Sequence, residues 1–86
     1  MEYVVIAFRS RAQTVKFYEL LTKNGVKAQI ISTPKEAGVG CGLSVRITLS
    51  VLLIAKTLLK KTQPSSFAGL FKVRESLGSR FINVIN

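Results

Sequence analysis

The sequence predicts an α+β domain of the ferredoxin-like, split β-α-β type, an antiparallel sheet with both helices on one face. Three observations predict it. Four segments have the length and apolar pattern of strands, two segments have helical periodicity, and their order is strand, helix, strand, strand, helix, strand. The chain has 86 residues, of which 48% are hydrophobic, so it can fold as one small domain.

The first half supplies a strand, a helix and a second strand. Tyr3–Phe8 is an unbroken β-branched and aromatic run, typical of a central strand. Arg11–Lys23 has helical periodicity, with Ser10 as the N-cap and Gln13 placed for a capping box. Val26–Ser32 then predicts a half-buried strand. One face of the helix is expected to be buried: Thr14, Phe17, Tyr18 and Leu21.

The second half repeats this order. Leu43–Leu49 alternates strictly between apolar and polar residues, as a strand with one buried face does. Ser50 is expected to cap a helix over Val51–Lys61, and Phe67–Val73 supplies the fourth strand. Right-handed crossovers place the first and third strands in the centre, with Val26–Ser32 and Phe67–Val73 at the edges. The second helix has one apolar face: Val51, Ile54, Ala55, Leu58 and Leu59.

We divide the chain into a domain over residues 1–73 and a C-terminal tail over residues 74–86. Gly78-Ser79 interrupts the tail, whereas Phe81-Ile82 and Val84-Ile85 are apolar. The tail is therefore either an extra strand, paired with a sheet edge or with a second copy of the chain, or a disordered terminus.

Charge and composition indicate the compartment and the class of partner. Lys and Arg number 13 against 4 acidic residues, a formal net charge of +9 that favours anionic partners, although the scattered charges also fit a merely soluble surface. Glu2 follows Met1 where a signal peptide would be basic, and Leu49–Leu59 falls short of the ~20 residues that span a bilayer. A single cysteine excludes an internal disulfide. We therefore expect a soluble, cytoplasmic protein that does not enter membranes.

The residue types that are missing exclude most catalytic chemistry. Without histidine the chain can build neither a Ser/His/Asp triad nor a Cys/His dyad. One cysteine, four dispersed glutamates and no aspartate do not make a metal site, so we expect no metal and no cofactor. Gly38–Gly42 resembles a nucleotide-binding glycine loop only faintly, because a strand follows it instead of a helix. A carrier or accessory protein is favoured over a classical enzyme.

Thr33–Gly42 contains the one potentially reactive atom, the sulfur of Cys41. This ten-residue link is longer than a usual hairpin loop, and glycines flank the cysteine on both sides. Backbone N–H groups and cations such as Lys35 or Arg46 would favour the thiolate, which can hold sulfur as a persulfide. The alternative is that Cys41 is a small hydrophobic residue packed under the loop. The residues alone leave both open.

Four short segments carry a resemblance to known proteins: Phe8-Arg9-Ser10, Asn24-Gly25-Val26, Ile31-Ser32-Thr33-Pro34-Lys35 and Gly40-Cys41-Gly42-Leu43-Ser44-Val45. They resemble the selenium/sulfur carrier-like family of small bacterial proteins, and the C-terminal module of certain selenium-metabolism proteins. The similarity covers roughly residues 3–73. It implies a cytoplasmic carrier whose Cys41 receives sulfur or selenium from a donor protein and passes it to an acceptor protein.

On this interpretation Cys41 is the carrier thiol, and Gly40 and Gly42 give the backbone access to its sulfur. Thr33, Pro34 and Lys35 shape and charge the opposite side of the loop. Members of the family often have arginine where Lys35 stands, so the planar fork that would hold an oxyanion is lost here. The resemblance does not account for the positive charge.

Two other functions are kept as alternatives. One is a small basic binding module for RNA or for an acidic protein; nucleic acid is the less favoured ligand, because Tyr3 and Phe8 are expected in the core and not on an exposed stacking surface. The other is an assembly domain that forms a homodimer through the Phe67–Val73 edge or the tail.

Overall fold

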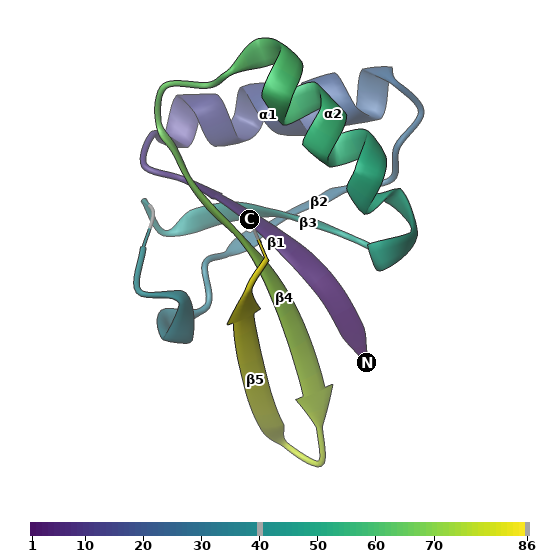
Figure 1. Cartoon of the computed structure of the whole chain (residues 1–86). Helices are drawn as coiled ribbons and strands as arrows, with labels where there is room; N and C mark the ends of the chain where they lie inside the picture. Colours follow the sequence, from purple (N-terminus) through teal and green to yellow (C-terminus); the bar gives the residue numbers. More distant parts are fainter. Residues whose placement is uncertain (40, 86) are drawn as a thin grey trace.

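A computed structural model describes residues 1–39 and 41–85 and confirms the predicted ferredoxin-like fold (Figure 1). Its strands form one antiparallel sheet in the order β2-β3-β1-β4-β5, with both helices on one face. The predicted central position of the first and third strands is confirmed. The elements are β1 (Glu2–Phe8), α1 (Arg11–Lys23), β2 (Gln29–Ser32), a 3-10 turn (Lys35–Ala37), β3 (Leu43–Ile47), a second 3-10 turn (Leu49–Val51), α2 (Leu52–Thr62), β4 (Phe67–Ser76) and β5 (Ser79–Val84).

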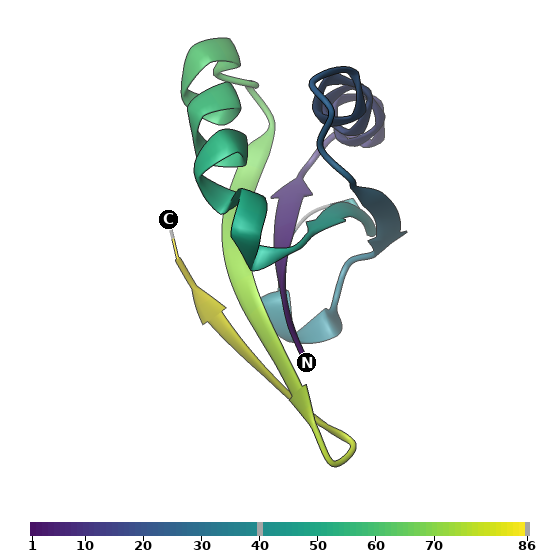
Figure 2. The same ribbon diagram turned by 90° about the vertical axis from the view of Figure 1, so that its right-hand side faces the viewer.

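Each face of the sheet has its own apolar cluster. On the helix face, Val4, Ile6 and Phe8 of β1 pack against α1 and α2. On the other face, alternate residues of β1 pack with Phe71 and Val73 of β4. The chain between β2 and β3 covers this second face through Ala37 and Val39, as Figure 2 shows. Burial on both faces explains why the β1 sequence is continuously apolar instead of alternating.

Helix α1 has the predicted bounds. The Ser10 hydroxyl oxygen accepts a hydrogen bond from the Gln13 N–H at 3.2 Å, which confirms the N-cap. The reciprocal half of a capping box is absent, because the Gln13 side chain bonds Ser65 and Ser66 instead. This pairing ties the first turn of α1 to the segment that precedes β4.

The predicted start of the second strand at Val26 is wrong by three residues, because α1 uses Val26 to end the helix. The Val26 N–H donates to the Leu21 carbonyl oxygen at 3.0 Å, and the Gly25 N–H donates to that of Thr22 at 3.0 Å. This is the Schellman arrangement, in which an apolar residue folds back on the helix. Val26 is accordingly buried in the helix-side cluster, and β2 pairs with β3 only from Gln29.

The start of the second helix also differs from the prediction. Ser50 does not cap it, since its hydroxyl lies 2.8 Å from that of Thr48, and a 3-10 turn precedes Leu52. The buried stripe is narrower than predicted: Ala55 and Leu59 are buried, whereas Ile54 is 47% exposed. Neither helix in the described part of the chain is both long and apolar enough to cross a membrane.

The predicted edge position of the fourth strand is wrong, because β5 covers it. Ile82 of β5 lies opposite Val73 of β4, and the Ile85 N–H donates to the Leu70 carbonyl oxygen at 3.0 Å. The two strands are joined by the two-residue turn Leu77-Gly78, and their hairpin extends beyond the helices (Figure 1). Residues 79–84 are therefore an added strand of the same sheet.

Candidate thiol site

Cys41 lies where three segments meet at one end of the sheet. Its N–H donates to the carbonyl oxygen of Phe8, the last residue of β1, at 3.0 Å. Its side chain is half-buried and lies against the first turn of α1 and the start of β3. The fold thus fixes the backbone of Cys41 while leaving part of its side chain accessible.

The sulfur has two polar neighbours. The Cys41 thiol donates to the Leu43 carbonyl oxygen, with 3.6 Å between Sγ and the oxygen. The Thr14 hydroxyl oxygen lies 3.9 Å from Sγ, 3.3 Å from the same Leu43 oxygen and 3.1 Å from the Ser10 carbonyl oxygen. A hydroxyl rotates to suit its surroundings, so Thr14 can donate to either carbonyl or to the sulfur.

Four of the predicted supporting residues line a hollow beside the loop. The Thr33 N–H donates to the Gly42 carbonyl oxygen at 2.9 Å, which closes the loop at its base. The Thr33 and Ser44 hydroxyls are 2.6 Å apart, on the sheet face away from α1. Thr33, Pro34, Lys35 and Gly42 line a shallow hollow of about 250 Å³ that Cys41 does not line.

Two glycines of the loop need backbone conformations that other residues adopt poorly. Gly38 has φ +66° and ends the 3-10 turn, where its N–H donates to the Lys35 carbonyl oxygen at 3.1 Å. Gly42 has φ +97° and leads from the cysteine into β3. The role predicted for Gly40 lies outside the described residues.

Of the two cations expected near the sulfur, Arg46 lies elsewhere, and the placement of Lys35 beside the sulfur stays a prediction. Arg46 stacks on the Tyr3 ring, with its guanidinium carbon 3.9 Å from the ring centroid, and this places it on the sheet face away from α1. Lys35 belongs to the hollow on that same side. In the described part of the chain, the polar groups beside Sγ are the Thr14 hydroxyl and the Leu43 carbonyl oxygen.

Sequence analysis missed Thr14 as a neighbour of the cysteine. Thr14 was predicted to be buried, and it is fully buried, but as part of the core face of α1. Its signal in the sequence is a hydroxyl among the apolar residues Phe17 and Leu21 of that face. A buried hydroxyl needs a partner, and here the partners are two carbonyl oxygens and the sulfur.

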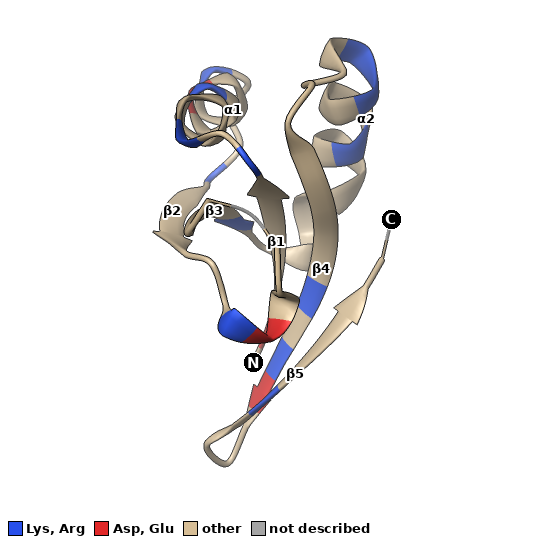
Figure 3. Ribbon diagram, turned by 90° about the vertical axis from the view of Figure 1, so that its left-hand side faces the viewer, with Lys and Arg blue, Asp and Glu red and all other residues tan. Residues whose placement is uncertain are grey.

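Positive charge gathers on the helices (Figure 3). The ion pairs among the described residues join Glu2 to Lys72, and Arg80 to both Glu36 and Glu75, and all of them lie on the sheet and its loop. Within the described part of the chain, no cation of α1 or α2 takes part in an ion pair. The described cations without an ion pair are therefore found mainly on α1 and α2, which together form the helix layer of the protein.

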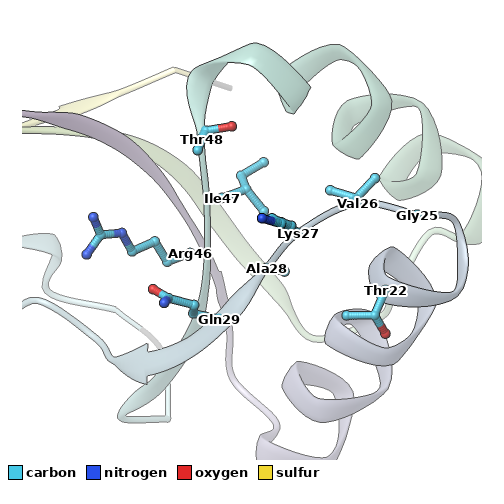
Figure 4. A pocket seen from close by; sticks show the side chains of 9 residues that line it. All are labelled: Thr22, Gly25, Val26, Lys27, Ala28, Gln29, Arg46, Ile47 and Thr48. Atoms are coloured by element: carbon cyan, nitrogen blue, oxygen red, sulfur yellow. The ribbon is translucent and has the colours of Figure 1, made fainter.

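A second hollow, of about 640 Å³, lies at the other end of the sheet from Cys41. It opens where the chain after α1 separates from the end of β3, between Gly25–Gln29 and Arg46–Thr48. Figure 4 shows Ile47 pointing toward the helices and Arg46 pointing away from them. Because its lining groups point to opposite faces of the sheet, this hollow does not form a convergent binding site.

A comparison with family models matches residues 3–67 to the family described as "Putative Se/S carrier protein-like". The match includes Cys41, both helices, and the strands β1 to β3. No curated protein and no solved structure gives a significant match.

Within the described residues, no group of three or more His, Cys, Asp or Glu side chains comes together to hold a metal ion.

Proposed function

We propose that this protein, which belongs to the Se/S carrier protein-like family, carries sulfur or selenium covalently on the thiol of Cys41. The observation that carries the proposal is that the single cysteine of the chain lies within the matched residues with a half-buried, accessible side chain. A carrier thiol must reach a donor and an acceptor in turn, and a fully buried sulfur could reach neither.

Loading requires no external oxidant if the donor is itself a persulfide. The Cys41 thiolate attacks the terminal sulfur of the donor persulfide. The new S–S bond forms on Cys41 while the donor S–S bond breaks, and the donor leaves as a thiolate that takes up the proton. Unloading is the same exchange with an acceptor thiolate. Selenium would be carried in the same way, as a terminal selenium atom on the Cys41 sulfur.

The neighbours of the sulfur fit both of its charge states. The thiol form has the Leu43 carbonyl oxygen, 3.6 Å away, as an acceptor for its proton. For the thiolate form, the Thr14 hydroxyl at 3.9 Å can rotate from Leu43 and direct its proton at the sulfur. We assign Thr14 as a positioning residue, because a hydrogen bond to the charged form favours that form.

Intact-mass measurement after incubation with a cysteine desulfurase and cysteine tests the proposal. We expect the wild type to gain the mass of one sulfur atom, and to lose it on treatment with a thiol reductant. Cys41→Ala is the control and should gain nothing. No gain on the wild type, or an equal gain on Cys41→Ala, would refute the carrier function.

Thr14→Val tests the positioning role with a nearly isosteric side chain. The rate at which Cys41 reacts with iodoacetamide, measured against pH, should fall, because the attacking sulfur loses the hydroxyl that lies 3.9 Å from it. Thr57→Val is the matched control, since Thr57 is also helical but donates only to the Leu53 carbonyl oxygen. An unchanged pH profile for Thr14→Val would remove Thr14 from the proposal.

A further inference from the structure

A groove runs along α1 on the side that faces the end of α2. Its volume is about 570 Å³. We propose that this interhelical groove is a docking site for a carboxylate-rich segment of a partner protein. The proposal goes beyond the carrier function and does not depend on Cys41. The groove is lined by Gln13, Lys16, Phe17, Glu19, Leu20, Lys23, Thr62, Gln63, Pro64 and Ser65.

The first argument is the distribution of charge. The segment from Arg9 to Lys27, which contains α1, has five cations and one carboxylate, and α2 has three lysines and no carboxylate. The two helices therefore hold five of the nine net positive charges, and Arg9 and Lys27, which flank α1, add two more. Since the described ion pairs all lie on the sheet and its loop, these charges are free to attract an anionic partner.

The second argument is the chemistry of the groove itself. Leu20 and Pro64 provide the apolar surface between the helices, over the almost completely buried Phe17, while Lys16 and Lys23 supply positive charge along α1. Gln63 and Ser65 add side-chain groups that can bond a peptide backbone. An apolar surface flanked by lysines is complementary to a peptide that alternates acidic residues with an apolar anchor.

The wall formed by residues 63–65 is held in place. The Gln13 amide donates to the Ser65 hydroxyl oxygen at 3.0 Å, and its oxygen accepts from the Ser66 N–H at 2.9 Å. The Arg9 N–H also donates to the Ser66 carbonyl oxygen, at 2.7 Å. A preformed groove costs less entropy to fill than one that must order on binding.

Single-stranded nucleic acid fits this protein less well than an acidic peptide. Its bases need exposed aromatic rings on which to stack. Tyr3, Phe8 and Phe71 of the sheet are at most 5% exposed, and Phe17 of the groove is 4% exposed. Phe81 of β5 is 57% exposed but does not line the groove. The lysines could hold phosphates, but the described surface of the groove offers no exposed ring for the bases.

Glu19 provides an internal test, because it is the one carboxylate among the lining residues. It lies between Lys16 and Lys23 along α1, so an acidic ligand in the groove must pass close to it. Removing its charge should therefore strengthen binding, whereas removing the lysine charges should weaken it. A site elsewhere on the protein would respond weakly to both changes.

The experiment measures the fluorescence anisotropy of a labelled peptide of roughly twelve residues, Glu-Glu-Leu-Glu repeated, against the Cys41→Ser protein at low salt. Lys16→Gln with Lys23→Gln should weaken binding by about tenfold, and Glu19→Gln should tighten it about twofold. Arg74→Gln, an exposed cation of β4, is the matched charge control and should change binding by less than about twofold. Amide chemical-shift changes should cluster at residues 13–23 and 62–65.

Three results would overturn the proposal: no peptide binding, equal weakening by Arg74→Gln, or shift changes outside the groove. It would also fail if oligo(dT) of equal charge bound the groove at least as tightly, because the ligand would then be nucleic acid. The Cys41→Ser background separates this test from the carrier function. Sulfur loading can fail while the peptide binds, and the reverse is equally observable.

Discussion

At the scale of single residues, Gln13 connects the first turn of α1 to the segment before β4. Its amide bonds the segment before β4, while its neighbour Thr14 lies beside the Cys41 sulfur. Both residues belong to the first turn of α1, which Ser10 caps. A change at Gln13 therefore disturbs the wall of the interhelical groove and, through α1, the setting of the thiol.

Gln13→Ala is expected to lower the free energy of unfolding by about 1–2 kcal/mol, because the Ser66 N–H loses its acceptor in a partly buried position. Urea denaturation checks the value. Gln29→Ala is the matched control, since Gln29 is exposed on the edge strand β2 and should change stability by less than about 0.5 kcal/mol. Equal effects at the two positions would mean that the Gln13 bonds contribute nothing.

At the scale of elements, the sequence predicts what its periodicity determines. The bounds of α1 follow from Ser10 and its apolar stripe, and the central strands follow from their apolar runs. It does not predict features that depend on competition between neighbours. Val26 has the residue type of a strand, but its N–H bonds the last turn of α1 instead. Ser50 has the residue type of an N-cap, but its hydroxyl lies beside that of Thr48 and does not cap α2.

The thiol site shows the same limit. The loop around Cys41 is visible in the sequence as glycines and a lone cysteine, yet its closest side-chain partner is Thr14, 27 residues earlier. Arg46 is near Cys41 in the sequence but stacks on Tyr3 on the other face of the sheet, because residues alternate along β3. Proximity along the chain is thus a poor guide to which groups surround the sulfur.

The sequence left open whether the tail forms an extra strand or is disordered, because the turn of the β4–β5 hairpin, Leu77-Gly78, lacks the usual Asn-Gly signal. Leu77 has φ +50° and is fully exposed. Leu77→Asn should raise the free energy of unfolding by about 0.5–1 kcal/mol, since asparagine tolerates this conformation better. Leu53→Asn is the control, because Leu53 is also exposed but lies in α2, where asparagine should lower stability.

Thermal and urea unfolding of both variants check this prediction. If Leu77→Asn and Leu53→Asn shift stability in the same direction, the turn conformation is not the cause.

At the scale of the whole molecule, the net charge of +9 acts over a body whose longest dimension is 35 Å. Electrostatic screening lengths are about 30 Å at 0.01 M salt and about 10 Å at 0.1 M. At low salt the cations of α1 and α2 therefore repel one another across the molecule, and at higher salt only near neighbours do. Unfolding separates these charges, so their repulsion lowers stability most when salt is low.

Raising NaCl from about 0.01 M to about 0.5 M should accordingly increase the free energy of unfolding by roughly 1 kcal/mol. Lys16→Gln with Lys56→Gln should be more stable than the wild type at low salt and less sensitive to salt, because one cation is removed from the middle of each helix. Urea denaturation at each salt concentration measures both. If the free energy of unfolding depends on salt equally in the variant and the wild type, repulsion between the cations of α1 and α2 is not the cause of the salt dependence.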